Sequence, residues 1–248
     1  MDCKRSTDLY HCTKSSSLIN ILKTKYFRYS YCLEEFNMPD DDYYVVKKYA
    51  YAMVCFADLL EKEVDDHMEQ FMADSYIVMD KKWAIQNDLS PVIYYGKKSL
   101  PHSSLLFLTK RIKLLYDTGL AGARELINAI GLLRPYYKLY EGHYFIKGTD
   151  KQSKDSVEFF LEREWRSIPS VKRGEHFYLE LEEYLDDEFR NKATQELCDH
   201  GYRLKFEWDD ILRIGYMEEK KDEILQTICE SFGVNENEAD NKTVIIHI

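Results

Sequence analysis

Short apolar runs rich in aromatic and β-branched residues recur along the chain and are separated by polar turns. Runs of this length predict strands rather than helices. The expected strands cover residues 8–12, 52–56, 75–79, 91–95, 157–168, 202–206, 211–216 and 243–248. Polar stretches without a hydrophobic period predict exposed loops at residues 37–44, 147–156 and 235–241.

Apolar residues at helical spacing mark a second set of elements. Residues 15–23 place Leu18, Ile21 and Leu22 on one stripe, behind serines that can cap a helix. Further helices are expected over residues 103–117, 121–133 and 217–233. The pattern therefore predicts a mixed α+β fold whose helices cluster in a mid-chain block and near the ends of the chain.

The length and composition of the chain fit a single globular domain. Its 248 residues are 45% hydrophobic and 14% aromatic, which is enough for a sizeable core. We expect one α+β domain over residues 1–248. Its core would cover residues 9–216, followed by a C-terminal helix and strand at 217–248.

Charge and cysteine usage narrow the function classes. The formal net charge is -10 and no long Lys/Arg run occurs, so non-specific nucleic-acid binding is not expected. The six cysteines form no C-x-x-C pair and the histidines lack metal-binding spacing, so no metal site is predicted. No signal peptide and no apolar window of about 18 residues is found, so we expect a cytoplasmic protein with reduced thiols and no membrane association.

One motif with candidate chemistry lies near the N-terminus. His11 and Thr13 lie where an expected strand turns into a helix, a position that ligands often approach. The imidazole can donate from one nitrogen and accept at the other, and Thr13 adds a hydroxyl. The alternative is that both side chains only close the turn. Tyr51, at the start of another expected strand, offers an aromatic face to a planar ligand.

The second motif is the stretch FFLEREWRSIPS at residues 159–170. In a strand, side-chain alternation would put Glu162, Glu164 and Arg166 on one face. Two carboxylates on one face can raise the pKa of one of them, or let one orient the other, while Arg166 offsets their repulsion. The alternative is a solvated strand face with a salt bridge worth under about 1 kcal/mol.

The order of the motifs LYHCT…SLINIL, AMVCFADL, YIVMDKKWA…LSPVIYY and FFLEREWRSIP resembles the AbiGi family of bacterial abortive-infection proteins. The similarity covers roughly residues 9–214, and EREWR is among its most distinctive pieces. The resemblance implies a role in phage defence, as the antitoxin half of a two-gene system with a cognate toxin as partner.

The YHCT segment followed by a helix is also similar to the opening of ADP-ribosyltransferase-like folds, and Glu162-Arg163-Glu164 matches their late E-x-E arrangement. This resemblance implies a single α+β domain with a split, mainly antiparallel sheet and a mid-chain helical block. It also implies that His11 binds the ribose of NAD, that Thr13 shapes the pocket and that Glu164 is the catalytic carboxylate, with Glu162 orienting a nucleophile. Such a carboxylate would stabilise the positive charge that builds on the ribose as the nicotinamide bond breaks.

The chain departs from those folds in their central Tyr or Ser-Thr-Ser element, for which Tyr51 is the candidate, so a binding-only descendant is an alternative. The implied site comprises His11, Glu162 and Glu164 as catalytic residues and His11, Thr13, Tyr51 and Arg166 as NAD-binding residues.

Three functions remain open at this point. The chain is an ADP-ribosyltransferase or NAD glycohydrolase, or a non-enzymatic antitoxin, or a scaffold that uses the fold for homo-oligomerisation. The acidic balance of the chain favours a basic protein partner. For the NAD pocket we expect residues 9–12 and 157–168 to lie close in one sheet, with His11 and Glu164 facing a common concavity.

Overall fold

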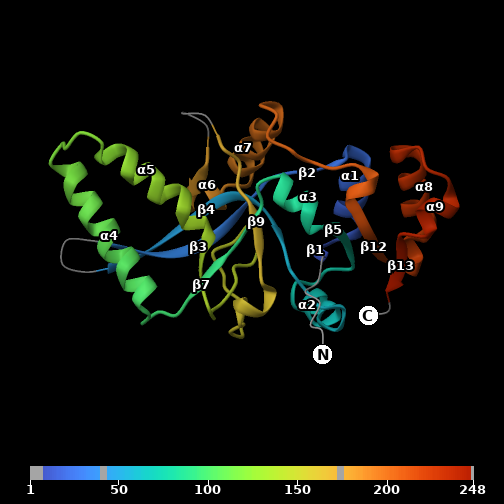
Figure 1. Cartoon of the computed structure of the whole chain (residues 1–248), viewed down its shortest axis with the longest axis horizontal. Helices are drawn as coiled ribbons and strands as arrows, with labels where there is room; N and C mark the ends of the chain where they lie inside the picture. Colours follow the sequence, from blue (N-terminus) through green and yellow to red (C-terminus); the bar gives the residue numbers. More distant parts are fainter. Residues whose placement is uncertain (1–7, 40–43, 172–175, 247–248) are drawn as a thin grey trace.

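The computed structural model describes residues 8–39, 44–171 and 176–246, which form a mixed α+β fold with two main sheets (Figure 1). The first sheet has the strand order β1–β5–β12–β13. Strands β12 and β13 run parallel, and the other neighbours run antiparallel. The bounds are β1 Asp8–Thr13, β5 Ser75–Asp80, β12 Ile211–Met217 and β13 Thr243–Ile246.

The second sheet is antiparallel and is organised around β4, with the order β10–β4–β9–β6 and β3 also paired to β4. The bounds are β3 Ser30–Pro39, β4 Tyr44–Phe56, β6 Ser90–Pro91, β9 Trp165–Ser167 and β10 Tyr178–Glu180. Two smaller sheets pair β2 (Tyr26–Phe27) with β11 (Leu204–Lys205) and β7 (Ile93–Tyr95) with β8 (Tyr137–Leu139). The long β4 therefore contacts strands from three separate parts of the chain.

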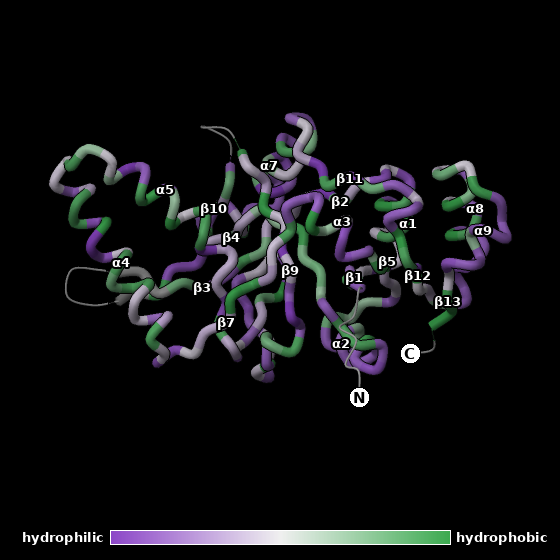
Figure 2. The backbone as a smooth tube through the Cα atoms, viewed as in Figure 1, coloured by the Kyte–Doolittle hydropathy of each residue, from purple (hydrophilic) through white to green (hydrophobic). Residues whose placement is uncertain are grey.

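The helices surround these sheets and extend beyond them at both ends of the molecule (Figure 1). Their bounds are α1 Ser15–Thr24, α2 Val64–Gln70, α3 Lys81–Gln86, α4 Leu100–Asp117, α5 Ala123–Leu133, α6 Leu181–Leu185, α7 Asp187–Asp199, α8 Lys221–Phe232 and α9 Glu236–Asp240. Helices α4 and α5 project at one end, and α8 and α9 lie at the other. Figure 2 shows hydrophobic residues spread along α4 and α5 although these helices stand at the outer end.

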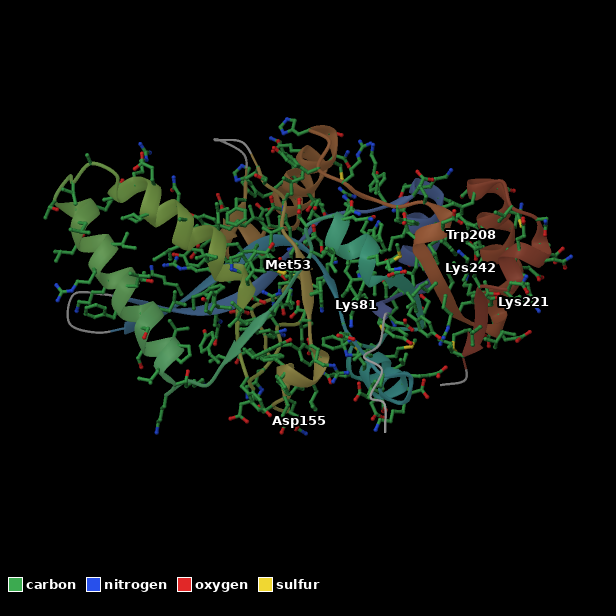
Figure 3. All side chains as sticks on the ribbon, viewed as in Figure 1. Met53, Lys81, Asp155, Trp208, Lys221 and Lys242 are labelled. Atoms are coloured by element: carbon green, nitrogen blue, oxygen red, sulfur yellow. The ribbon has the colours of Figure 1, made fainter. Side chains whose placement is uncertain are left out.

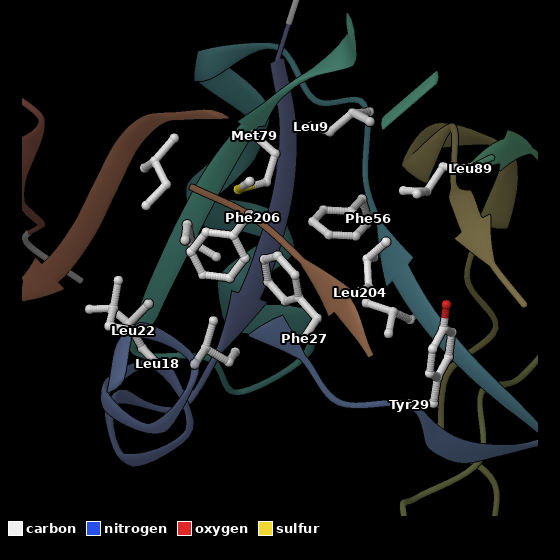
Figure 4. Close-up of a cluster of buried hydrophobic side chains, with 14 of the residues drawn as sticks. Leu9, Leu18, Leu22, Phe27, Tyr29, Phe56, Met79, Leu89, Leu204 and Phe206 are labelled. Atoms are coloured by element: carbon white, nitrogen blue, oxygen red, sulfur yellow. The ribbon is translucent and has the colours of Figure 1, made fainter. Parts of the chain in front are cut away.

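The largest hydrophobic cluster draws on the first sheet, the end of β4 and the helices α1, α3 and α8 (Figure 4). Phe27 is at its centre, with ring centroids 5.0 Å from Phe56, 5.0 Å from Phe206 and 5.9 Å from Trp83. Aromatic pairs at such distances contribute about 0.5–1.5 kcal/mol each beyond the area they bury. This packing fixes the end of β4 beside β1.

A short bridge joins the two main sheets at this point. The backbone N–H of Tyr10 donates to the carbonyl of Ala57, and the N–H of Ala57 donates back to Tyr10, both at 2.8 Å. Tyr10 lies in β1 and Ala57 directly follows β4. The two sheets therefore meet at a seam, and His11 lies on that seam.

At the end of the molecule near α8 and α9, Lys242 fixes the approach to β13 (Figure 3). Its Nζ donates to the carbonyls of Trp208 and Ile211, each at 2.8 Å, and lies 4.6 Å from the centroid of the Trp208 ring. Burial lowers the pKa of Lys242. These contacts secure the parallel pairing of β13 with β12.

The α+β class, the antiparallel sheets and the mid-chain helices are confirmed by the structure. The strand expected over residues 157–168 is wrong, because Phe159–Glu162 form a short 3-10 helix and the strand is limited to Trp165–Ser167. Residues 236–240 form α9 rather than a loop, because Asn235 caps that helix. Of the acidic loop expected at residues 37–44, residues 40–43 lie outside the described residues.

The expectation that residues 9–12 and 157–168 share one sheet is also wrong. Strand β1 belongs to the first sheet and β9 to the second. The two strands are connected indirectly, because β9 pairs with β4 and β4 reaches β1 through the bridge at Tyr10.

Candidate functional site

A cavity of about 500 Å³ lies at the seam between the two main sheets. It is lined by His11 of β1, Cys32 of β3, Cys55 of β4, Lys138 of β8 and Arg166 of β9, together with residues of the connecting segments. Cavities of this volume are typical of small-molecule sites. The seam therefore provides a partly open cavity that is lined by residues of both sheets.

His11 enters this cavity from the first sheet. Its Nδ1 lies 2.8 Å from the carbonyl oxygen of Cys55, and its ring is 5.2 Å from Phe27 and 5.4 Å from Phe56. Burial lowers the pKa of His11, so the ring is neutral near pH 7. Because a carbonyl oxygen only accepts, Nδ1 carries the proton and Nε2 keeps its lone pair. His11 can therefore accept a hydrogen bond or a proton at Nε2.

A tight turn before β9 directs the two glutamates of the E-x-E motif. Arg163, between them, has a left-handed φ of 44°, a conformation that costs a non-glycine residue about 1–2 kcal/mol. The Nε of Arg163 donates to the carbonyl of Asp58 at 2.6 Å, and its guanidinium pairs with Glu63. These contacts hold the turn, and both Glu162 and Glu164 line the cavity as a result.

Arg166 is the centre of a buried ionic network. Its side chain is 1% exposed, and it donates from Nε to Glu164 Oε1 at 2.8 Å and from Nη2 to Glu164 Oε2 at 3.0 Å. It also pairs with Glu34 and donates to the carbonyl of Pro135. A bidentate pair of this kind fixes the position of the carboxylate as well as neutralising it.

Lys138 joins the two glutamates from β8. Its Nζ lies 2.8 Å from Glu164 Oε2, 3.4 Å from Glu162 Oε2 and 4.2 Å from the centroid of the Phe159 ring. Burial alone would lower the pKa of Lys138, but the charges of Glu162 and Glu164 outweigh it and raise the pKa above its usual range. Lys138 is therefore a permanent cation between the two carboxylates.

The two glutamates have opposite electrostatic properties. Burial opposes ionisation of Glu164, but Arg166 and Lys138 outweigh it and hold its pKa well below the usual range. For Glu162, burial is the largest cause and raises the pKa, Lys138 opposes the rise, and the Glu164 charge adds to it. Glu162 Oε1 is buried without a hydrogen-bond partner among the described residues. Glu164 is thus a fixed anion, whereas Glu162 is the carboxyl group able to hold a proton.

The rest of the cavity combines aromatic walls with basic groups at its edge. The rings of Tyr31, Tyr95 and Tyr137 contribute to the lining, and the exposed Lys97 and Lys147 add two cations. Aromatic walls suit a planar ring, and cations at the edge suit an anionic group such as a phosphate. The lining therefore combines aromatic surface with positive charge.

A second neutral imidazole, that of His67, lines the same cavity. Burial lowers its pKa to about 4, and Lys138 contributes to that shift. The cavity lining accordingly includes two imidazoles whose pKa values are lowered by burial, beside a network of paired charges.

The structure brings four of the predicted site residues together, since His11, Glu162, Glu164 and Arg166 all line this cavity. Thr13 and Tyr51 are absent from the described residues that line it. The carbonyl of Thr13 accepts from Ser75 Oγ at 3.0 Å.

Tyr51 is 2% exposed and packs against Phe36 and Phe177, with ring centroids 5.5 Å and 5.3 Å apart, in a cluster that borders the cavity at Met53. A direct contact of Thr13 or Tyr51 with a ligand in the cavity therefore lacks support in the geometry.

Sequence reasoning missed Lys138 and Glu34, which complete the ionic network. Lys138 lies between Tyr137 and Leu139, and a lysine inside such an apolar run is a recognisable sign of a buried partner. Glu34 lies in a segment where no strand was expected, so its sequence context does not indicate a buried ion pair. Its pairing depends on β3 lying beside β4.

The described part of the chain has neither a metal-binding cluster nor a membrane-spanning helix. No group of three or more His, Cys, Asp or Glu side chains there could hold a metal ion. Within the same residues, every helix is too short or too polar to cross a membrane.

Comparisons with known proteins agree on one family. A family profile described as "Putative abortive phage resistance protein AbiGi, antitoxin" matches residues 25–217. This chain is 27% identical over 144 residues to a protein named "Abortive phage resistance protein AbiGi" from Lactococcus lactis subsp. cremoris. That alignment covers 52% of this chain and 55% of the relative, so the chain spans about half of the relative's length. No solved structure matches.

Proposed function

Because the chain belongs to the AbiGi family, we propose that it acts in abortive phage resistance and that the cavity between its two sheets binds a nucleotide such as NAD. The observation that carries the nucleotide proposal is Glu162, whose Oε1 is buried without a partner among the described residues. It lines the same cavity as the neutral His11. An unsatisfied buried oxygen costs about 1–3 kcal/mol, and a hydroxyl of a bound ligand would recover this cost.

Each part of a nucleotide has a counterpart in the lining. The aromatic side chains would stack on a base, and Lys97 and Lys147 would pair with phosphate oxygens. His11 Nε2 and the Glu162 carboxyl would bind ribose hydroxyls, because one accepts a hydrogen bond and the other accepts or donates one.

The electrostatics favour Glu162 over Glu164 for any chemistry at the ribose. Glu164 is neutralised by Arg166 and Lys138, so it has little charge left to stabilise a developing cation. We therefore assign Glu164 to holding Arg166 and Lys138 in place. Glu162 is the candidate for contact with the ribose, in an ADP-ribosyltransferase or NAD glycohydrolase reaction or in a binding-only site.

Isothermal titration calorimetry with NAD and ADP-ribose tests the proposal on wild-type protein, Glu162→Gln and the control Glu158→Gln. Glu158 is exposed and lies outside the described cavity lining, so its substitution should leave binding unchanged. We expect wild type to bind, and Glu162→Gln to bind at least about tenfold more weakly, the loss expected for one hydrogen bond to a charged group. Absence of binding to wild type, or equal binding by Glu162→Gln, would contradict the nucleotide proposal.

A second candidate function is that of an antitoxin, which neutralises a partner toxin by direct contact. The family description includes the word antitoxin, and α4 and α5 expose many large apolar side chains that suit a protein partner. Co-expression with the toxin encoded beside the gene should suppress its toxicity and give a complex on gel filtration. Undiminished toxicity without a complex would remove this candidate.

A further inference from the structure

The α4–α5 hairpin, residues 100–133, stands apart from the rest of the molecule. Its two helices contact each other, and α4 also packs on β3 (Figure 1). Among the described residues of α4, only His102, Leu106 and Ile112 are buried. In α5 the buried residues are Ala123 and Ile130. Most of the surface of both helices is therefore open.

The open surface of α4 is apolar in a regular pattern. Leu100, Phe107 and Leu114 follow one another at intervals of seven residues and are 82%, 59% and 52% exposed. Leu108 and Leu115 form a second row beside them and are 50% and 37% exposed. Residues seven apart lie on one line along a helix, and α4, at about 1.5 Å per residue, extends for about 27 Å. This is the pattern of a helix that packs against a partner along its length.

Helix α5 also exposes large apolar side chains. Leu126 and Leu133, again seven residues apart, are 47% and 50% exposed, and Leu132 is 52% exposed. So many exposed large apolar side chains on two successive helices favour an interaction site over the ordinary surface of a monomer.

The charge of the hairpin region is opposite to that of the chain. Residues 97–134 contain seven Lys/Arg and two Asp/Glu, a formal charge of +5. The whole chain carries -10, so the remainder carries -15. The exposed apolar side chains of α4 and α5 therefore lie in a basic part of an otherwise acidic chain.

From this combination we propose that the α4–α5 hairpin is the docking surface for the partner toxin, and that the toxin presents an acidic surface with an apolar groove for α4. The proposal rests on the antitoxin function and specifies its contact. It reverses the expectation from overall composition that the partner is basic, because the negative charge of the chain lies outside residues 97–134. Opposite charge on the partner would guide the encounter, and the leucine rows would supply the affinity.

The distribution of side chains favours a protein over the other occupants. A membrane-surface helix separates its apolar and charged faces, whereas Arg111 lies between the two apolar rows and its guanidinium is 5.2 Å from the Phe107 ring centroid. Two hairpins of +5 repel each other, which disfavours pairing with the hairpin of a second copy.

The test uses the full-length chain and the toxin encoded beside its gene. Phe107→Asp/Leu114→Asp disrupts the exposed apolar row, and Arg111→Glu/Arg124→Glu lowers the formal charge of residues 97–134 from +5 to +1. Ile85→Asp, at an isoleucine that is 62% exposed on α3, is the matched control. Circular dichroism checks folding, and calorimetry between 50 and 500 mM NaCl measures complex formation.

We expect the aspartate pair to weaken the complex about 30-fold or more, the loss typical of an interface hot spot, and Ile85→Asp to leave it unchanged. The glutamate pair should weaken it mainly at low salt and reduce the dependence on salt. A complex that all these variants form as tightly as wild type would overturn the docking proposal while the antitoxin function stands. No complex with wild type would overturn both.

Two further results would assign the surface to another occupant and also overturn the proposal. In one, wild type without toxin self-associates on gel filtration and the aspartate pair is monomeric, while toxin binding is unaffected. In the other, wild type sediments with phosphatidylglycerol vesicles, whereas Phe107→Asp/Leu114→Asp does not sediment with them and still binds the toxin.

Discussion

Glu164→Gln is the most direct test of the ionic network of Glu164, Arg166 and Lys138 that lines the cavity. Glu164 is 5% exposed and accepts hydrogen bonds from Arg166 Nε at 2.8 Å, Arg166 Nη2 at 3.0 Å and Lys138 Nζ at 2.8 Å. Glutamine keeps the size of the side chain but removes the charge. It also turns an NH₂ group toward one of the two cations.

The size of the effect follows from the burial of these partners. Removing one member of a buried ion pair costs about 3–5 kcal/mol, because the partner charge is left uncompensated. Arg166 retains Glu34 and Lys138 retains Glu162, so we expect the lower end, a loss of about 3 kcal/mol in the free energy of unfolding. In a chain of this size about 1 kcal/mol shifts Tm by about 2–4 °C, so Tm should fall by about 6–12 °C.

Urea unfolding at pH 7 measures this loss as a lower midpoint at an unchanged m value. Glu158→Gln, on the exposed residue upstream, should change the free energy of unfolding by no more than about 0.5 kcal/mol. The folded-state pKa of Glu164 is lowered, so its stabilisation is present above the unfolded pKa of about 4.3 and is lost as the pH falls through the folded pKa. A loss under about 1 kcal/mol at pH 7 would refute the network as described.

Two further substitutions test other features. The pKa of Glu162 is raised in the folded state, so between the unfolded pKa of about 4.3 and the folded pKa the folded chain binds more protons than the unfolded chain. The free energy of unfolding of wild type therefore falls as the pH rises through this range, and Glu162→Gln should remove this part of the pH dependence. Urea midpoints of wild type and variant that change in parallel with pH would contradict the prediction. At Gly215 a Cβ would lie 2.3 Å from the buried Tyr76 ring, whereas at Gly96 it would meet nothing within 4 Å. Gly215→Ala should therefore lower the free energy of unfolding by about 1–3 kcal/mol and Gly96→Ala should not, and equal melting temperatures would show that the ring can move.

The sequence was informative where hydrophobic period and local chemistry act together. The strand at residues 75–79 and the helix behind the serines at 15–23 match β5 and α1 within one residue. Asp80 caps α3 by accepting from the backbone N–H of Lys82 at 2.7 Å, which is the contact that an aspartate directly before a helix typically makes. These elements depend on neighbouring residues, which a sequence pattern contains.

The turn at Arg163 could not be predicted in this way. Alternation treats residues 157–168 as one strand, because nothing in the letters indicates a left-handed φ at a non-glycine residue. That conformation depends on Asp58 and Glu63, which are distant in sequence. The proximity of Glu162, Glu164 and Arg166 was anticipated, but their contact with Lys138 depends on tertiary packing.

The ionic network also sets the order in which parts of this chain can form during synthesis. Glu34 and Arg166 are 132 residues apart, and Lys138 lies between them in sequence. At about 5–20 residues per second, Glu34 leaves the ribosome roughly 7–26 s before the arginine that pairs with it. Glu34 therefore emerges with its carboxylate still in water, and the ionic network that lines the cavity can form only after residue 166 has been made.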